Sequence, residues 1–391
     1  MADASRQPCV VGIAQTEYRR WGGFVDRSEL ELACEVVAGA AADAGLPLDE
    51  VDGLCSYAED RNEPALLQAA LGLPALRFAS LVWGGHGTGS CAALQHAASA
   101  VQAGTANHVI VLRALCQGQG VRFGRFIPGM LAGSNFLAPF GMFSPPAMVA
   151  PLVQRYMHDY GIRAEHLGEV ALTCRDNASR NPRAVMRGRA MTMQTYLDSR
   201  MIASPLRLYD CCQENDGACA LLVTTLERAR DLRARPVRIL AAAHANNPGW
   251  GTGALGTHNM PLDEYGSGNG AAVARQVFGQ AGLRPADIDV AQIYDHFTGL
   301  VLMTLENYGF CGRGEAGAFV EAGNIRWPDG ALPINTSGGH LSEAYIHGLN
   351  LAVEGVRQIR GESTSQVQGA QTCLVTSGLG GPMNSAVVFG A

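Results

Sequence analysis

The pattern of apolar and polar residues along the chain predicts helices that alternate with short strands. Residues 30–43 and 271–280 carry apolar side chains at helical spacing. Residues 108–113, 219–225 and 372–376 are short runs rich in apolar and β-branched residues, which is typical of buried strands. Helices that alternate with such strands usually cover both faces of a mainly parallel sheet, so we expect an α/β fold.

Two matches between distant parts of the chain indicate an internal duplication. Residues 44–52, AGLPLDEVD, match residues 281–289, AGLRPADID, and each follows a predicted helix and leads to a strand. Residues 84–113 match residues 338–376, because both contain Gly-Gly-His, then a helix, then a strand. The second of these helices is expected to continue to about residue 360. The matches predict two similar α/β halves packed into a layered sandwich.

The boundary between the halves is predicted near the charged stretch 227–235, which gives halves of residues 1–230 and 231–391. A loop insertion is expected at about residues 117–207, where Gly, Pro, Phe and Met are frequent. Long loops inside compact domains are usually functional. This one could serve as a lid or dimer contact, or it could form an apolar wall for a large hydrophobic substrate.

Composition predicts a cytoplasmic globular protein. The 391 residues are 47% hydrophobic and 16% charged, which is enough apolar material for two cores. The first residues lack a signal pattern and no apolar run reaches the roughly 18 residues of a membrane span, so we expect no membrane segment. Eleven cysteines without regular spacing indicate reduced, buried thiols. A net charge of −6 argues against nucleic acid as a partner.

The chain has no lysine, because all 29 basic residues are arginine. Schiff-base chemistry through a lysine is therefore excluded, and carbon–carbon bond chemistry must use hydrogen-bond donors, general acids and bases, or a metal. A stretch without acidic residues, between residues 63 and 159, is locally positive. Its arginines could contact the phosphates of coenzyme A, or they could be ordinary solvated or intersubunit residues. They are Arg77, Arg113, Arg122, Arg125 and Arg155.

Three alternative functions are not supported, because each lacks a residue or a motif that it requires. Residues 87–92 formally match a dinucleotide fingerprint, but the acidic residue that should follow about 20 positions later is absent. The chain has no Gly-x-Ser-x-Gly elbow, so an α/β-hydrolase is unsupported. His340 and His347 could share a helix face, but they lack a third ligand at suitable spacing, so no metal site is predicted.

Several segments resemble thiolase motifs in the same order and at similar spacing. Residues 335–345, NTSGGHLSEAY, resemble the glycine-rich C-terminal loop of thiolases. Further matches lie at residues 10–16, 214–218, 294–297 and 377–381. Over essentially its full length, the chain resembles the sterol-carrier-type, lipid-transfer branch of the thiolase superfamily. The resemblance implies a thiolase-like fold with duplicated α/β halves in a layered α-β-α-β-α sandwich.

The resemblance also implies that the residues needed for thiolysis are missing. His86 stands at the position of the nucleophilic cysteine, Ser377 at the second cysteine, and Tyr345 at the loop histidine. Cys91 lies five residues beyond the nucleophile position, more than one helical turn away, and is expected to pack in the core. The chain therefore has no candidate nucleophile for acyl-enzyme formation.

Retro-aldol cleavage remains possible, because it passes through an acyl-CoA enolate and needs no covalent nucleophile. The chain resembles the lipid-transfer-protein aldolases that shorten steroid side chains. The resemblance implies cleavage of a 17-hydroxy steroid with a three-carbon acyl-CoA side chain into a 17-keto steroid and propionyl-CoA. It implies no cofactor beyond the coenzyme A of the substrate. It also implies a homodimer with an OB-fold partner of the DUF35 type, often fused to or encoded beside a MaoC-like hydratase.

Two tyrosines at the thiolase site positions are the predicted acid–base pair, Tyr294 and Tyr345. Asp295 and His296 are expected to orient the first tyrosine, and His347 is expected to lie near the second. A tyrosine has an ordinary pKa near 10, so a base role needs a nearby cation or a histidine relay. The available relays are His296, His340 and His347.

Glycines in two loops are candidates for oxyanion and ligand contacts, because glycine allows the backbone to approach a ligand closely. They are Gly338, Gly339, Gly380 and Gly381. A tight turn explains each of them equally well.

A second function stays open, that of a catalytically silent thiolase-like subunit that binds acyl-CoA or lipid and scaffolds a partner. Loss of the cysteines fits both functions. The gain of tyrosines at two separate site positions favours chemistry, because a decaying site is expected to lose polar groups.

Overall fold

A large mixed sheet organises the computed structural model, which describes residues 6–83, 87–120, 138–142, 144–232, 235–250, 264–381 and 383–391. The strand order is β10-β11-β12-β9-β1-β8-β5-β3-β4, and β2 pairs with β8. The strands are β1 (Pro8–Gln15), β2 (Arg19–Arg20), β3 (Gly53–Tyr57), β4 (Phe78–Val82), β5 (Val109–Leu115), β8 (Asn215–Thr225), β9 (Val237–Ala245), β10 (Val290–Gln292), β11 (Thr372–Thr376) and β12 (Asn384–Gly390), with a separate hairpin of β6 (Met201–Ala203) and β7 (Leu206–Arg207).

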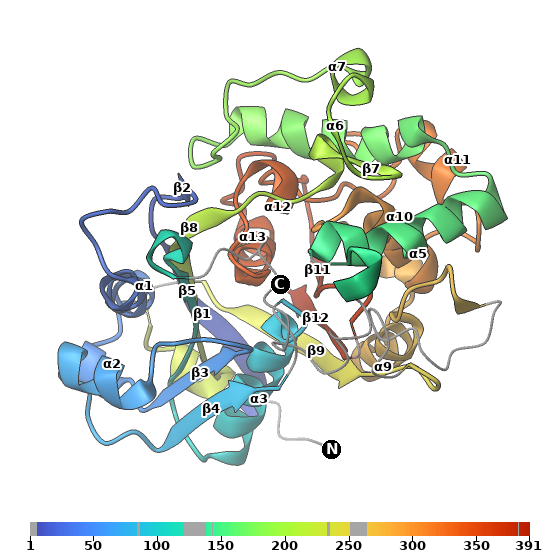
Figure 1. The fold of residues 1–391 in the computed structure, drawn as a ribbon. Coiled ribbons are helices and arrows are strands. Elements are labelled where there is room, and N and C mark those ends of the chain that lie inside the picture. Colours follow the sequence, from blue (N-terminus) through green and yellow to red (C-terminus); the bar gives the residue numbers. More distant parts are fainter. Residues whose placement is uncertain are drawn as a thin grey trace.

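Helices pack on this sheet and between its two halves (Figure 1). They are α1 (Glu29–Ala44), α2 (Pro64–Leu71), α3 (Ser90–Ala103), α5 (Pro145–Tyr160), α6 (Ala164–Arg180), α7 (Met193–Leu197), α8 (Leu226–Ala229), α9 (Ala271–Ala281), α10 (Thr298–Asn307), α11 (Ala316–Glu321), α12 (Gly339–Ser342) and α13 (Leu349–Arg360). No helix of the described residues is long and apolar enough to cross a membrane.

The two halves of the sheet repeat one topology, which confirms the predicted duplication. In the first half the order is β1-β8-β5-β3, and in the second it is β9-β12-β11-β10. The β3–β5 and β10–β11 pairs are parallel, and the other neighbours within each half are antiparallel. A short antiparallel pairing between β1 and β9 joins the halves into one sheet.

The matching Ala-Gly-Leu segments end equivalent helices. Gly45 ends α1 with φ of 73°, and Gly282 ends α9 with φ of 66°. This left-handed conformation is strained for residues with a Cβ, so glycine stops both helices at the same point. The start of α1 is fixed by a capping box between Ser28 and Glu31.

Alternating side chains on the strands divide the core into layers. On β8, Leu221 and Val223 face a core that contains α3 and α13, whereas Ala220 and Leu222 face a core that contains α1. A third core lies beyond the second half of the sheet and contains α9 and α10. Figure 1 shows α13 between α1 on one side and α9 on the other. The predicted α-β-α-β-α sandwich is therefore confirmed.

The region between β5 and β8 is not a loop throughout, so the prediction of a loop insertion at 117–207 was wrong in this respect. Its described part contains α5, α6, α7 and the β6–β7 hairpin. Leu167, Val170 and Cys174 form one apolar face of α6, which packs in the core of the second half. The glycine-rich and proline-rich segments 123–130 and 136–143 fall mostly outside the described residues. The half boundaries at residues 230 and 231 stay a prediction.

The helix expected from His340 to about residue 360 is interrupted. Helix α12 ends at Ser342, and α13 begins at Leu349. Between them, His347 has φ of 48° and Gly348 has φ of 92°, and these left-handed residues turn the chain out of helical geometry. The interruption creates a buried loop at residues 343–348, which carries Tyr345.

Candidate active site

Tyr294 and Tyr345 meet at the centre of the molecule. Tyr294 lies just after β10, and its Oη is 2.9 Å from the Oη of Tyr345 in the 343–348 loop. Their exposed fractions are 2% and 7%. The backbone N–H of Tyr294 donates to Thr376, and that of Tyr345 donates to Asn215. The structure therefore brings together the two tyrosines that the sequence singled out, while their catalytic roles stay a prediction.

Three glycines form the wall around Tyr294. A Cβ at Gly87 would lie 1.7 Å from the Tyr294 Oη, and a Cβ at Gly348 would lie 2.7 Å from its ring. A Cβ at Gly378 would lie 3.3 Å from the ring. These glycines leave room for a phenol where other residues would clash. Sequence reasoning missed Gly87 and Gly348, although the adjacent motifs pointed to their neighbourhood. His86, predicted at the nucleophile position, lies outside the described residues.

Three histidine rings surround the tyrosine pair. The His340 and His296 ring centroids lie 4.4 Å and 4.9 Å from that of Tyr294. The His347 centroid lies 5.0 Å from that of Tyr345. Burial lowers the pKa of His340 well below its usual value, and neighbouring His296 acts in the same direction. Both effects favour the neutral form of the His340 imidazole.

Burial raises the pKa of both tyrosines well above the usual value. Tyr345 raises the pKa of Tyr294 further, whereas the Tyr294 hydroxyl and Arg113 lower the pKa of Tyr345. Tyr345 is thus the member of the pair that has nearby groups able to stabilise a phenolate.

Arg113 connects the site to a buried carboxylate. Its Nη2 lies 2.7 Å from Nδ1 of His347, and its Nη1 donates to the Tyr57 carbonyl oxygen at 2.7 Å and to Asp60 at 3.3 Å. The side chain is 3% exposed. The sequence offered Arg113 only as a possible contact for coenzyme A phosphates or as a surface residue, and the structure corrects both readings. Its position beside His347 depends on a contact between residues 234 positions apart.

Asp295 holds the glycine-rich loop in place. Its carboxylate accepts the backbone N–H of His340 at 2.8 Å and that of Leu341 at 3.1 Å. Burial raises the pKa of Asp295 to about 6, although these two N–H groups act in the opposite direction. A Cβ at Gly339 would lie 2.2 Å from this carboxylate. Asp295 thus holds the loop whose His340 ring packs against Tyr294, and its predicted role in orienting Tyr294 stays a prediction.

The other candidate glycines occupy turns beside the site. Gly338 has φ of 113° and donates its N–H to the Asn335 carbonyl oxygen at 2.8 Å, so this donor is already used within the loop. Gly380 has φ of 86°. The carbonyl oxygen of Gly381 accepts a hydrogen bond from Asn269. The turn explanation accounts for Gly338, and an oxyanion hole at these loops stays a prediction.

The remaining thiolase positions carry groups with structural contacts. The Ser377 hydroxyl accepts the backbone N–H of Ser385 at 2.7 Å. Cys91 is fully buried in α3, its Sγ lies 3.5 Å from the Val375 carbonyl oxygen, and burial raises its pKa to about 12. This agrees with the expected core role of Cys91. Among the described residues, no group of three or more metal-binding side chains comes together.

The layered fold and a buried centre of tyrosine, histidine and glycine-rich loops define a thiolase-like protein. The family model described as "Thiolase C-terminal domain-like" matches residues 263–389. The chain is 43% identical to the 17-hydroxy-3-oxo-4-pregnene-20-carboxyl-CoA lyase of Mycobacterium tuberculosis, over 98% of this chain and 99% of that relative. It is 42% identical to the steroid side-chain-cleaving aldolase of Thermomonospora curvata, over 98% and 97% of the two chains.

A solved structure described as "Ltp2-ChsH2(DUF35) aldolase" is similar along the whole length. It covers 99% of this chain and 98% of its own, at 40% identity and a TM-score of 0.92. The chain belongs to the thiolase-like family of sterol carrier protein 2 (SCP2) type, which confirms the resemblance that the sequence motifs indicated.

Proposed function

We propose that this protein is a carbon–carbon lyase that cleaves the side chain of a β-hydroxyacyl-CoA steroid by a retro-aldol reaction. The observation that carries the proposal is the buried pair of hydroxyls of Tyr294 and Tyr345, 2.9 Å apart, in a thiolase-like fold. The relatives named above are a lyase and an aldolase of steroid side chains, which confirms the sequence prediction of this enzyme class. The proposed substrate is a 17-hydroxy steroid carrying a three-carbon acyl-CoA side chain.

The reaction redistributes one proton and needs no oxidant. A base removes the proton of the 17-hydroxyl, the bond between the α- and β-carbons breaks, and the β-carbon becomes a ketone. The electron pair forms the enolate of propionyl-CoA, and an acid returns one proton to its α-carbon. Coenzyme A enters and leaves as part of the substrate and product, and the proposal includes no other cofactor.

Tyr345 is the proposed base and Tyr294 the proposed acid. Arg113 lowers the pKa of Tyr345, and the Tyr294 hydroxyl donates to the Tyr345 oxygen, so a negative charge is better stabilised on Tyr345. After Tyr294 has protonated the enolate, the proton held by Tyr345 can cross the 2.9 Å hydrogen bond and restore the pair. His340, His296 and the Asp295-bound loop hold the Tyr294 ring in position.

A DUF35-type OB-fold protein is the proposed partner, because the similar solved structure is described as a complex with such a protein. A homodimer is supported by β4, one of the two edge strands of the large sheet. Leu81 on this strand is 60% exposed and Trp83 just beyond it is 83% exposed, which is unusual for side chains of this size. Association with a MaoC-like hydratase and a cytoplasmic location also remain parts of the proposal.

Mass spectrometry of the products tests this function directly. The purified protein, with and without a DUF35-type partner, is incubated with a 17-hydroxy-C22-steroid-CoA. Propionyl-CoA and the 17-keto steroid are expected in equal amounts. If the thioester binds but is recovered intact in both mixtures, the chain is instead a silent subunit that binds acyl-CoA and scaffolds a partner.

A further inference from the structure

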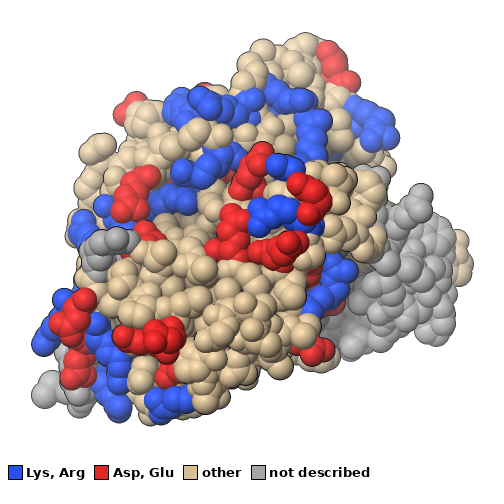
Figure 2. All heavy atoms as spheres, turned by 90° about the vertical axis from the view of Figure 1, so that its left-hand side faces the viewer, with Lys and Arg blue, Asp and Glu red and all other residues tan. Residues whose placement is uncertain are grey.

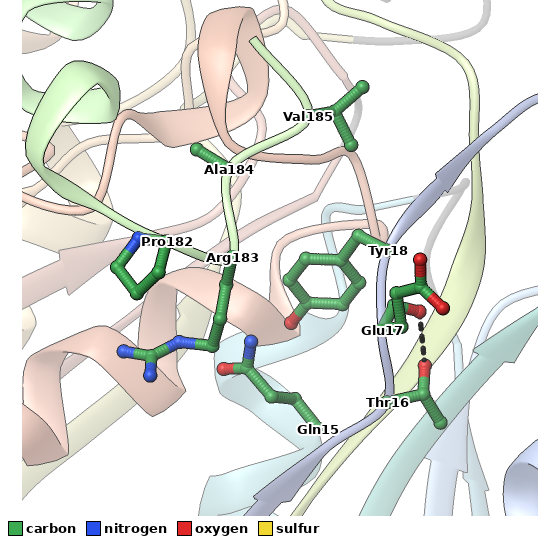
Figure 3. A pocket seen from close by; sticks show the side chains of 8 residues that line it. All are labelled: Gln15, Thr16, Glu17, Tyr18, Pro182, Arg183, Ala184 and Val185. Atoms are coloured by element: carbon green, nitrogen blue, oxygen red, sulfur yellow. Dashed lines mark hydrogen bonds between the residues drawn. The ribbon is translucent and has the colours of Figure 1, made fainter. Parts of the chain in front are cut away.

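A pocket that does not include the tyrosine pair lies between the end of β1 and the segment that follows α6. It has a volume of about 420 Å³, within the range of small-molecule sites. It is lined by Gln15, Thr16, Glu17, Tyr18, Pro182, Arg183, Ala184 and Val185 (Figure 3).

Three buried hydrogen-bond donors in this pocket have no nitrogen or oxygen acceptor among the described residues. The Tyr18 side chain is 5% exposed, and its hydroxyl has a sulfur neighbour, Cys219 of β8, but no nitrogen or oxygen partner among the described residues. The buried Nε of Arg183 and Nε2 of Gln15 also lack an acceptor within the described part of the chain. Buried donors are normally satisfied, so three of them around one space indicate a ligand that accepts hydrogen bonds.

A hydrogen bond from Arg357 fixes the orientation of the Gln15 amide. Arg357 of α13 donates from its Nη2 to Oε1 of Gln15. Arginine carries donors and no acceptor, so the amide oxygen must face Arg357 and the amide nitrogen must face the other way. Gln15 therefore presents a donor to the pocket.

The charges around the pocket favour an anion. Burial lowers the pKa of Arg183, and the nearby positive charge of Arg357 lowers it further. Glu17 lines the pocket, but its carboxylate forms a salt bridge to Arg19 at 3.0 Å and is turned away in Figure 3. The carboxylate of Glu354 lies 3.9 Å from the guanidinium of Arg357, so it is a counter-charge to that arginine.

Glu343 is the other nearby acidic group. Its carboxyl bonds to Ser337 at 2.7 Å and to Asn181 at 3.0 Å, and burial raises its pKa to about 7. It is therefore only partly charged at neutral pH, and it leaves Arg183 without a full counter-charge.

We propose that this pocket is a binding site for a small oxyanion, a phosphate or carboxylate group, held by Tyr18, Gln15 and Arg183. A tetrahedral or planar oxyanion offers several acceptors to donors that converge from different directions. The wall of the pocket is hydrogen-bonded to the 343–348 loop, because Val185 N–H donates to the Glu343 carbonyl oxygen at 2.9 Å. The bound anion thus lies one hydrogen bond away from the segment that carries Tyr345.

Calorimetric titration with inorganic phosphate, and separately with acetate, tests the site at constant ionic strength set with chloride. Tyr18→Phe and Arg183→Gln are expected to weaken binding of the anion by about tenfold each, since each removes a hydrogen bond to a charged group. Arg187→Gln is the matched control, because Arg187 is exposed in the same segment but does not line the pocket. Its binding should equal that of the unmodified protein.

Thermal unfolding separates loss of binding from loss of folding. Without added anion, Tyr18→Phe should unfold at or above the temperature of the unmodified protein, because it removes a buried hydroxyl that has no nitrogen or oxygen partner. With phosphate, the unmodified protein should gain more stability than this variant. The proposal is overturned if neither anion binds the unmodified protein, or if Tyr18→Phe and Arg183→Gln bind as it does.

Coenzyme A and its 3′-dephospho form identify the source of the group. If Tyr18→Phe weakens binding of coenzyme A but leaves binding of the dephospho form unchanged, the pocket takes the 3′-phosphate of the thioester substrate. If it weakens binding of inorganic phosphate or acetate alone, the pocket takes a free oxyanion. Binding to Tyr18 and Arg183 is required in both cases.

Discussion

The Nη2 of Arg113 donates a hydrogen bond to Nδ1 of His347 across 2.7 Å in the interior of the molecule. Arginine has no acceptor, so Nδ1 must be the unprotonated nitrogen and the ring proton must reside on Nε2. Arg113 is itself fixed by Asp60 at 3.3 Å, and the Tyr57 hydroxyl fixes the His347 backbone at 2.9 Å. The protein thus selects one neutral tautomer of a histidine beside Tyr345.

Arg113→Lys should therefore change the ionisation of the site more than substrate binding. The lysine keeps a positive charge near Asp60 but loses the planar fork that reaches His347. We expect kcat to fall by about tenfold or more, KM to change little, and the rise of activity with pH to shift to higher pH. The control is Arg155→Lys on α5, where the arginine is partly exposed and pairs with Asp159. A lower kcat with an unshifted pH profile would reduce Arg113 to a purely structural role.

Tyr294→Phe and Tyr345→Phe should each abolish most turnover and preserve binding of the acyl-CoA. Loss of a general acid or base typically costs about 100-fold or more in rate. Steady-state kinetics gives the rate, and calorimetric titration with the substrate under non-turnover conditions gives the affinity. Tyr308→Phe is the matched control, because Tyr308 is 3% exposed but packs against Phe278 in another core. If both site variants turn over as fast as Tyr308→Phe, then Tyr294 and Tyr345 are not the acid–base pair.

Gly87→Ala should inactivate the protein without unfolding it. The added Cβ would lie 1.7 Å from the Tyr294 Oη, so the phenol must move away from Tyr345. Activity assays should show a loss close to that of Tyr294→Phe, while circular dichroism shows a native spectrum. Gly279→Ala on α9 is the control, since nothing lies within 4 Å of its added Cβ. That change should leave activity intact and add about 0.5–1 kcal/mol of stability. Full activity in Gly87→Ala would show that the close approach of Gly87 to Tyr294 is not needed for activity.

We expect the free energy of unfolding to fall as pH rises from about 4.5 to about 7, because the Glu343 carboxyl is buried. Burial is the main cause that raises the pKa of this carboxyl from 4.5 to about 7 in the folded state. Below pH 4.5 the group is protonated in both states, and the full stability is present. Between these values the unfolded chain loses the proton and the folded one keeps it, which costs roughly 3 kcal/mol over the window.

Urea unfolding at a series of pH values checks this prediction. Glu343→Gln should show a smaller loss of unfolding free energy across the window, because its amide does not ionise. The exposed control Glu50→Gln should follow the unmodified protein. Parallel pH curves for Glu343→Gln and the unmodified protein would show that Glu343 does not titrate in this window.

Much of the fold could be predicted from local pattern. The strand at 372–376 was predicted with its observed bounds, and the helix ends at Gly45 and Gly282 followed from a repeated Ala-Gly-Leu step. Helical and strand periodicities depend on residues a few positions apart, which the sequence displays directly. The break between α12 and α13 was missed because two left-handed residues, His347 and Gly348, sit in an otherwise helical pattern.

The sequence by itself determined the duplicated α/β architecture, the absence of lysine chemistry and the pair of tyrosines at the centre of the site. The tertiary structure decided which groups surround that pair. Arg113 and Gly87 reach it from separate segments, and Tyr18 and Arg183, which are more than 160 residues apart in the chain, meet at one pocket. Burial and hydrogen bonding, which set the pKa of each group, exist only after those segments pack together, so they could not be inferred from local sequence.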